Sequence, residues 1–140
     1  MTTISQPNPP GHSWTEILKR PTQEAFASAF TDNVVIDTSV AARSMVGPVD
    51  LRSFFDASRT MYDAIHFTHE TSSGSRTCLE WEGKFQGKDI AGTTILAFNA
   101  SGAIESVQLY HRPYEQVIAY SAELGRRLKG KIDPSIFPEL

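Results

Sequence analysis

The chain has 140 residues, a length typical of one domain, and its 40% apolar and 21% charged residues are an ordinary globular composition rather than a disordered one. Its formal net charge of −3 lacks the basic excess of nucleic-acid binders, so we expect no nucleic-acid partner. No apolar run approaches the ~20 residues that span a membrane, and the first residues lack the basic and apolar regions of a signal peptide, so a cytoplasmic protein is expected.

The first part of the chain predicts two short helices followed by a strand. Residues 1–12 are polar and rich in proline, and we expect them to form a flexible tail. Ser13 begins a capping-box pattern and predicts the start of a helix. Thr22 is expected to cap a second helix that continues through Phe30. The β-branched run that follows predicts a strand over 33–38.

The middle of the chain predicts one long helix and then four strands. Asp50 is expected to cap the helix, because an apolar stripe with helical spacing follows it up to Tyr62. The four candidate strands occupy residues 65–71, 76–82, 85–98 and 103–111. Pro113 predicts the start of a last helix that ends at Gly130. Its expected inward face consists of Tyr114, Val117, Ile118, Ser121, Leu124 and Leu128.

This order of elements predicts an α+β fold, with N-terminal helices packed on a mostly antiparallel sheet. The domain is expected over residues 13–130, and residues 131–140 are expected to form a loosely packed C-terminal tail. In residues 93–98 both alternating sets of side chains are largely apolar. That strand should therefore be covered by helices on one face and by a second subunit on the other, which predicts a homodimer.

Several sequence motifs of catalysis and metal binding are absent. No dinucleotide-binding glycine pattern, phosphate loop or nucleophile elbow occurs in the sequence. His66 and His69 are three residues apart, a spacing that places them on opposite faces of a regular strand, so no metal site is expected from them. The single cysteine, Cys78, is expected to be a buried and inert thiol. The sequence predicts no metal and no cofactor.

Four polar residues are candidates for chemistry: Asp37, Arg43, Thr94 and His111. Asp37 closes an apolar strand and is either a general base with a raised pKa or a solvated strand-end carboxylate. Arg43 lies in the following loop and either clamps an anionic ligand or is solvated. His111 follows Val107 and Leu109 at alternating positions, so it faces inward if they do. It is then an acid or base of a pocket, or a hydrogen-bonded residue at the rim of the sheet.

Three stretches carry a resemblance to a known family: residues 30–37, 46–55 and 92–107. Their pattern resembles the SnoaL-like branch of the nuclear transport factor two-like superfamily, which also contains ketosteroid isomerases and limonene epoxide hydrolases. The resemblance extends from about residue 13 to residue 112. It implies a cone in which three helices pack on a curved sheet around an apolar pocket, with dimers often formed through the sheet.

The resemblance also implies positions for a site. The position of the isomerases' catalytic aspartate is matched by Thr38, one residue after Asp37, and the oxyanion-hole position is matched by Thr94. Tyr110 matches a strand-end aromatic residue, and His111 follows it. The full set of residues expected to contact a ligand is Trp14, Phe30, Thr38, Arg43, Phe54, Tyr62, Trp81, Thr94 and Leu109.

Three functions remain open from the sequence. The first is a cofactor-independent isomerase, cyclase or dehydratase that transfers protons on a small, mostly apolar carbonyl compound. His111 would be its acid or base, Thr94 a hydrogen-bond donor, and Asp37 a second base or a residue that orients His111. The second is a domain that binds a small apolar or carbonyl-containing molecule without chemistry. The third is a dimerisation domain whose pocket is filled by its own core.

Overall fold

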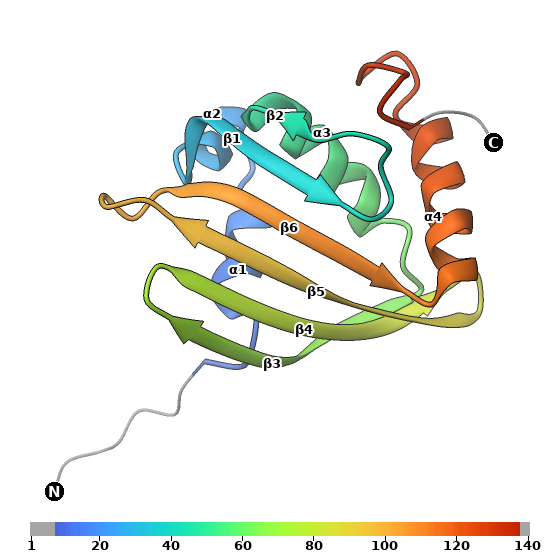
Figure 1. Ribbon diagram of the computed structural model, residues 1–140, viewed down its shortest axis with the longest axis horizontal. Helices are drawn as coiled ribbons and strands as arrows, with labels where there is room; N and C mark the ends of the chain where they lie inside the picture. The colour runs from blue at the N-terminus through green and yellow to red at the C-terminus, as the bar shows by residue number, and fades with distance from the viewer. Residues whose placement is uncertain (1–7, 138–140) are drawn as a thin grey trace, which may run out of the picture.

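Six strands form one curved sheet that runs through the middle of the molecule (Figure 1). The computed structural model describes residues 8–137, so most of the expected N-terminal tail and the last three residues lie outside the described range. In chain order the elements are α1 (His12–Leu18), α2 (Gln23–Ala27), β1 (Phe30–Thr38), β2 (Met45–Val46), α3 (Pro48–Arg59), β3 (Ala64–Ser73), β4 (Arg76–Phe85), β5 (Lys88–Phe98), β6 (Ile104–Arg112) and α4 (Tyr114–Arg127). The α+β class and all four candidate strands are confirmed, with boundaries that differ by a few residues.

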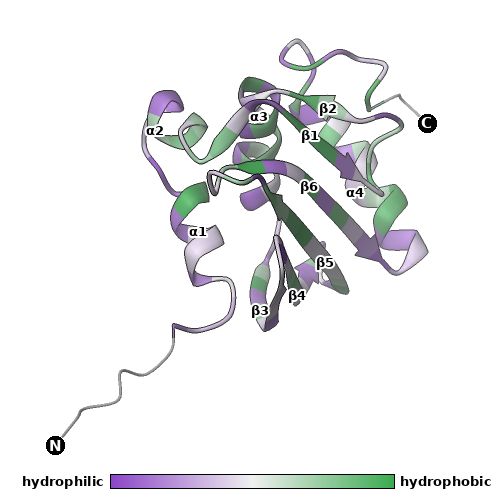
Figure 2. Ribbon diagram, turned by 60° about the vertical axis from the view of Figure 1, so that its left-hand side comes forward, coloured by the Kyte–Doolittle hydropathy of each residue, from purple (hydrophilic) through white to green (hydrophobic). Residues whose placement is uncertain are grey.

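The strand order is β2-β1-β6-β5-β4-β3, so the first long strand lies beside the last one. β1 and β6 are parallel, and every other neighbouring pair is antiparallel. Alternation of side chains decides which face of each strand is buried. Ile36 of β1 and its partner Val107 of β6 are buried, whereas the residues beside them along each strand are more exposed. Figure 2 shows this alternation as hydrophobic and hydrophilic bands along the strands.

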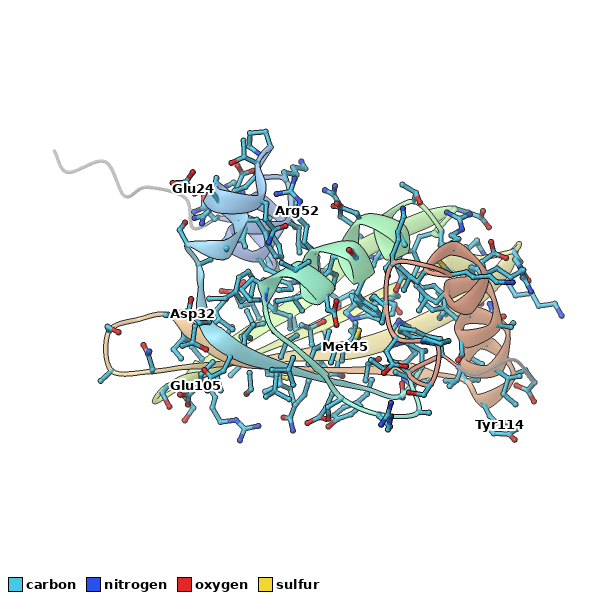
Figure 3. The ribbon with its side chains drawn as sticks, turned by 90° about the horizontal axis from the view of Figure 1, so that it is seen from above. Glu24, Asp32, Met45, Arg52, Glu105 and Tyr114 are labelled. Carbon is cyan, nitrogen blue, oxygen red and sulfur yellow. The ribbon has the colours of Figure 1, made fainter. Side chains whose placement is uncertain are left out.

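Helices α1 and α3 cover one face of the sheet, which we call the inner face, and no helix of the described range covers the outer face (Figure 1). α3 buries Leu51, Phe54, Phe55 and Ser58 on one side. That side is the apolar stripe predicted from the sequence. Figure 3 shows α3 from above, lying across the sheet. The Nη2 of Arg52 on α3 donates to the carbonyl of Pro21 at 3.1 Å, and this contact joins α3 to the segment before α2.

The helix starts differ from those expected. Ser13 does not cap α1, because Gly11 is the N-cap in a left-handed conformation (φ 77°) and its N–H donates to Oε1 of Glu70 on β3 at 2.9 Å. Gly47, rather than Asp50, precedes the first residue of α3. Thr22 caps α2 as predicted, through a bond from the N–H of Ala25 at 3.0 Å.

The short helix α2 ends three residues before the expected position at Phe30. Phe30 instead begins β1, because it pairs with Ile104 of β6. The buried face of α4 also differs from the expected one. Tyr114 is 74% exposed, whereas Tyr120 is completely buried. The buried residues of α4 are Gln116, Tyr120 and Leu124, and Leu128 follows at the same spacing of four. Leu124 and Leu128 are buried as predicted, whereas Gln116 and Tyr120 replace the first part of the predicted face.

The segment after α4 packs on the core instead of forming a loose tail. Ile136 and Phe137 are buried. The ring of Phe137 stacks on that of Phe54 with centroids 6.1 Å apart, and the carbonyl of Ile136 accepts a hydrogen bond from the N–H of Ala42 at 2.8 Å. The last described residues therefore close the end of the core beside α3.

A β-bulge in β3 changes the faces of two histidines. Phe67 pairs with Trp81 and His69 pairs with Glu80, so Thr68 is an extra residue without a partner of its own. The extra residue places His66 and His69 on the same face, contrary to the expectation for a regular strand. Each histidine lies beside a glutamate of β4. Residues 8–137 nevertheless contain no cluster of three or more side chains suited to hold a metal ion.

The helices of the described range are short or amphipathic. None of them has both the length and the apolar character that a membrane crossing requires.

Candidate functional site

A cavity of about 250 Å³ lies between the inner face of the sheet and helices α1 and α3. Most of its lining is aromatic or aliphatic, and Thr15, Ser58, Tyr62 and Thr94 supply hydroxyl groups. Its lining consists of Trp14, Thr15, Leu18, Lys19, Phe55, Ser58, Arg59, Tyr62, Ile65, Phe67, Trp81, Thr94 and Leu109. A small number of polar groups in an otherwise apolar cavity is typical of small-molecule sites.

Edge-to-face aromatic contacts hold the walls of the cavity. The rings of Trp14 and Phe55 lie 5.3 Å apart, and those of Tyr62 and Trp81 lie 5.6 Å apart. Such pairs are worth about 0.5–1.5 kcal/mol beyond their burial. Gly92 of β5 makes room for Trp81, because a Cβ at that position would collide with the indole ring and with the carbonyl oxygen of Tyr110.

His111 lies directly behind this lining. It is 6% exposed and faces inward, as the alternation with Val107 and Leu109 predicts. Its Nε2 is 3.0 Å from the hydroxyl oxygen of Tyr62, and the indole of Trp81 packs edge-on to it at 5.1 Å. Burial lowers the pKa of His111 to about 3, so the imidazole is neutral at pH 7. The Nδ1 atom has no partner among the described residues.

Two further hydroxyls extend the polar cluster behind the cavity. The Tyr120 hydroxyl donates to the carbonyl of Ser58 at 3.2 Å and also hydrogen-bonds the Ser58 hydroxyl. Burial raises the pKa of Tyr120 to about 12. Burial together with the adjacent Tyr120 raises the pKa of Tyr62 well above its ordinary value. Both phenols therefore stay protonated at neutral pH and can act as hydrogen-bond donors.

Asp37 does not join this cluster. It is exposed on the outer face, where it pairs in register with Gln108 and accepts a hydrogen bond from the hydroxyl of Ser44. Val34 and Ile36 face the core, so alternation turns the residue between them and the residue after them outward. The proposed Asp37–His111 pair is therefore wrong, since the two side chains lie on opposite faces of the sheet.

The structure brings together about half of the residues expected to contact a ligand. Those that line the cavity are Trp14, Tyr62, Trp81, Thr94 and Leu109. Phe30 and Phe54 are buried but do not line it. They pack in the core, where Phe30 lies against Phe26 and Phe54 against Phe137.

Two further predicted ligand contacts lie away from the cavity. The Thr38 hydroxyl accepts the N–H of Val40 at 3.3 Å within a turn. The Arg43 side chain is 59% exposed, and its Nη2 lies 3.5 Å from a carboxylate oxygen of Asp133. Arg43 thus connects the loop after β1 to the segment after α4 and does not reach the cavity.

Several lining residues were not identified from the sequence: Thr15, Leu18, Lys19, Phe55, Ser58, Arg59, Ile65 and Phe67. Phe55 and Ser58 belong to the predicted apolar stripe of α3, so periodicity alone places them inward but does not distinguish cavity from core. Phe67 reaches the cavity from β3, where it also packs against Gly11. Because Gly11 and Phe67 are far apart in the sequence, no local sequence pattern predicts this contact.

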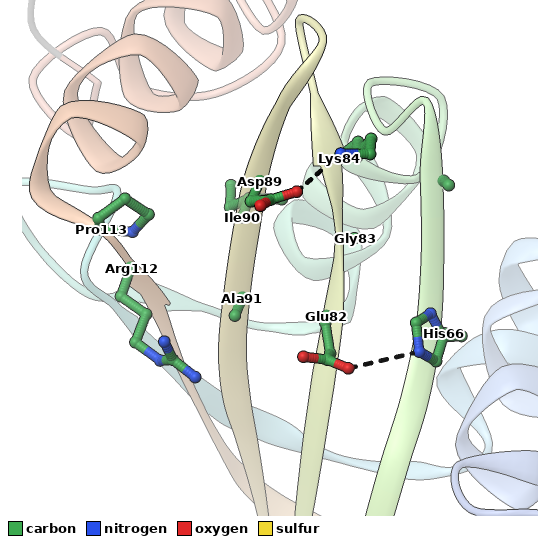
Figure 4. Close-up of a pocket in the computed structure, with 10 residues that line it drawn as sticks. His66, Glu82, Gly83, Lys84, Asp89, Ile90, Ala91, Arg112 and Pro113 are labelled. Atoms are coloured by element: carbon green, nitrogen blue, oxygen red, sulfur yellow. Dashed lines mark hydrogen bonds and ion pairs between the residues drawn. The ribbon is translucent and has the colours of Figure 1, made fainter.

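A second hollow of about 510 Å³ lies on the outer face of the sheet (Figure 4). Its lining consists of Ala64, His66, Glu82, Gly83, Lys84, Asp89, Ile90, Ala91, Arg112 and Pro113. Its polar side chains largely pair with one another, because Lys84 Nζ lies 2.7 Å from Asp89 and His66 Nε2 lies 3.6 Å from a carboxylate oxygen of Glu82. The ion pair raises the pKa of Lys84 and lowers the pKa of Asp89. We call this hollow the outer groove.

Solved structures share this architecture. A steroid Δ-isomerase from Pseudomonas aeruginosa matches with a TM-score of 0.75 and 18% identity over 84% of this chain and 88% of its own. An uncharacterised protein with a cystatin-like fold from Silicibacter pomeroyi matches with a TM-score of 0.74 and 16% identity over 83% of this chain and 82% of its own. A protein of the SnoaL-like family from Agrobacterium tumefaciens matches with a TM-score of 0.55 and 16% identity over 74% and 94% of the two chains.

The chain therefore shares the fold of these solved structures, and the fold implied by the resemblance of its sequence pattern is confirmed. No family model matches the chain, and no curated protein matches it in sequence. At these identities the likeness extends to the fold, and a function has to be argued from the site.

Proposed function

We propose that the chain binds a small, mostly apolar molecule in the cavity between α1, α3 and the sheet. The observation that carries this proposal is a mostly apolar lining that also carries the hydroxyls of Thr15, Ser58, Tyr62 and Thr94. The volume of about 250 Å³ lies just below the ~300–1,000 Å³ of drug-sized sites and suits a one- or two-ring compound. A single carbonyl on that compound could accept hydrogen bonds from Tyr62 or Thr94.

A bicyclic ketone, 1-tetralone, tests this proposal. We expect it to raise the melting temperature in a concentration-dependent way, because a ligand that binds only the folded state stabilises it by mass action. Leu109→Phe adds a ring to the lining and should abolish the shift. Tyr110→Phe, at the next residue on the outer face, is the matched control and should leave the shift unchanged. No shift with the unaltered chain, or an equal shift in Leu109→Phe, would contradict a ligand site here.

Proton transfer is a second candidate function, supported by the hydrogen bond between Tyr62 in the lining and the buried His111. A donor to a carbonyl stabilises a developing enolate. Among the described lining residues, however, none is an aspartate, glutamate or histidine that could remove the proton. The low pKa of His111 makes it a weak base. The geometry therefore favours binding over catalysis.

Deuterium exchange separates these two functions. In D2O a catalyst would accelerate the exchange of the α-protons of 1-tetralone, followed by NMR. The acceleration should disappear in Tyr62→Phe and persist in Tyr114→Phe, which changes an exposed tyrosine outside the cavity. Saturable binding without accelerated exchange would support the binding function and contradict catalysis of proton transfer.

We further propose that the chain forms a homodimer through the outer face of the sheet. Thr93, Ile95 and Ala97 of β5 are only half-buried there, and Tyr110 is 43% exposed. A second copy would cover these side chains. Light scattering after size-exclusion chromatography tests this directly: Ile95→Lys should convert a dimer to a monomer, and a monomeric parent chain would contradict the proposal.

A further inference from the structure

Two basic side chains, Lys19 and Arg59, lie where the cavity opens to solvent. Both belong to its lining and both are exposed, whereas most of the other lining residues are buried or half-buried. Lys19 follows the last residue of α1, and Arg59 ends α3. Two helices that are distant in sequence therefore bring positive charge to one opening.

These charges are only partly neutralised by the protein. Arg59 lies 3.7 Å from Asp56, but the same carboxylate also lies 3.5 Å from Arg52, so one anion is shared by two guanidinium groups. Lys19 forms no ion pair within residues 8–137. No aspartate or glutamate occurs among the described residues that line the cavity. The opening thus carries a net positive charge above an apolar interior.

We infer that the ligand of this cavity is an amphipathic anion, with an apolar body inside and one carboxylate at the opening between Lys19 and Arg59. This inference rests on the proposed binding function and names its ligand class. An apolar body gains from leaving water. A carboxylate left at the rim keeps part of its hydration and still gains charge-assisted hydrogen bonds from the two cations. A carboxylate placed deeper would lose its hydration without meeting a positive group.

Both residues also lie at C-terminal helix ends, where a cation is favourable without any ligand. The experiment therefore has to separate a contact with ligand from a contribution to the helix. Two probes of the same shape, 2-naphthoate and 2-naphthamide, differ in charge. Calorimetric titration should give roughly ten-fold tighter binding of the naphthoate at low salt, and much of this preference should be lost at 0.5 M salt because the opening is exposed to solvent.

The variants Lys19→Gln and Arg59→Gln should each weaken naphthoate binding by roughly three- to five-fold, as expected for exposed ion pairs. Neither should change the affinity for naphthamide. Lys129→Gln is the matched control, because it removes an exposed cation just after α4, outside the cavity. It should leave both affinities unchanged.

Equal affinity for the two probes would overturn the inference while leaving the proposed binding function intact. A variant that weakens both probes equally would also overturn it, because Lys19 or Arg59 would then act on the structure of the cavity. Binding of neither probe by the unaltered chain, together with the absence of a shift with 1-tetralone, would remove the proposed function and this inference with it.

Discussion

The cavity and the outer groove lie on opposite faces of the same sheet, and their polar groups differ in burial and in charge. On the inner face the polar atoms of Tyr62 and His111 are buried and neutral, and they are held by one another. On the outer face Lys84 and Asp89 keep their charges and pair in solvent. Burial penalises charge on one side, whereas water screens it on the other. A polar substitution should therefore matter far more inside than outside.

The largest contrast should come from two neighbouring residues of β4. Trp81 is 3% exposed on the inner face, whereas the Glu82 side chain is 61% exposed on the outer face. Trp81→Ala should lower the free energy of unfolding by about 3–5 kcal/mol through lost burial and an added void. Glu82→Ala should change it by less than about 0.5 kcal/mol. Urea unfolding measures both, and similar losses would break the distinction between the faces.

The acid sensitivity of the inner face should come next in size. His111 has a folded-state pKa of about 3 and an ordinary pKa near 6.5 when unfolded, so the unfolded chain binds more protons as the pH falls. The stability is fully present above about pH 6.5 and is lost toward pH 3. The loss due to His111 should reach about 2–3 kcal/mol between pH 8 and 4.5.

Unfolding at several pH values isolates this contribution by comparison of variants. His111→Gln should remove it and so flatten the pH dependence relative to the parent chain. If the parent and His111→Gln have the same slope, His111 is not buried in its neutral form.

A smaller effect is expected for the hydroxyl of Tyr62. Tyr62→Phe leaves the buried Nε2 of His111 without this partner, which should cost about 1–2 kcal/mol. Tyr114→Phe removes a hydroxyl from a side chain that is 74% exposed and should have no measurable effect. Denaturant midpoints distinguish the two, and an unchanged midpoint for Tyr62→Phe would mean that water replaces the lost bond.

The smallest effect should be that of the outer ion pair. Asp89→Asn removes the partner of Lys84, both side chains being exposed, and should leave the unfolding midpoint unchanged. The pKa of Lys84 should fall back toward its ordinary value, as measured by NMR titration, because Asp89 is the main cause of its rise. A clear loss of stability would show that the outer groove is less open to water than its exposure indicates.

Periodicity explains why most of the fold could be predicted and why parts of the site could not. The stripe of α3 and the alternation of β6 are local, and both gave correct faces. The start of α1 depends on a hydrogen bond from Gly11 to Glu70, which lies 59 positions further along the chain. The local capping-box pattern at Ser13 therefore predicted the wrong N-cap. The extra residue Thr68 likewise depends on the register with β4 and turned the face of His69.

The site illustrates the same limit. Alternation correctly placed His111 inward, and applied to Val34 and Ile36 it would also have placed Asp37 outward. What alternation could not show is that Tyr62 stands between His111 and the cavity. That contact joins the segment after α3 to the end of β6, through two residues that are 49 positions apart in the sequence.

The parallel pairing of β1 with β6 has a consequence for how the chain forms during synthesis. Phe30 meets Ile104, and Ile36 meets Val107, so the long partner of β1 emerges from the ribosome only after every other strand. Translation proceeds at about 5–20 residues per second. For several seconds the nascent chain therefore exposes the edge of β1 that later pairs with β6. On the opposite edge, the two residues of β2 are the only neighbour of β1 among the described strands. That interval is when a chaperone has the most apolar surface to bind.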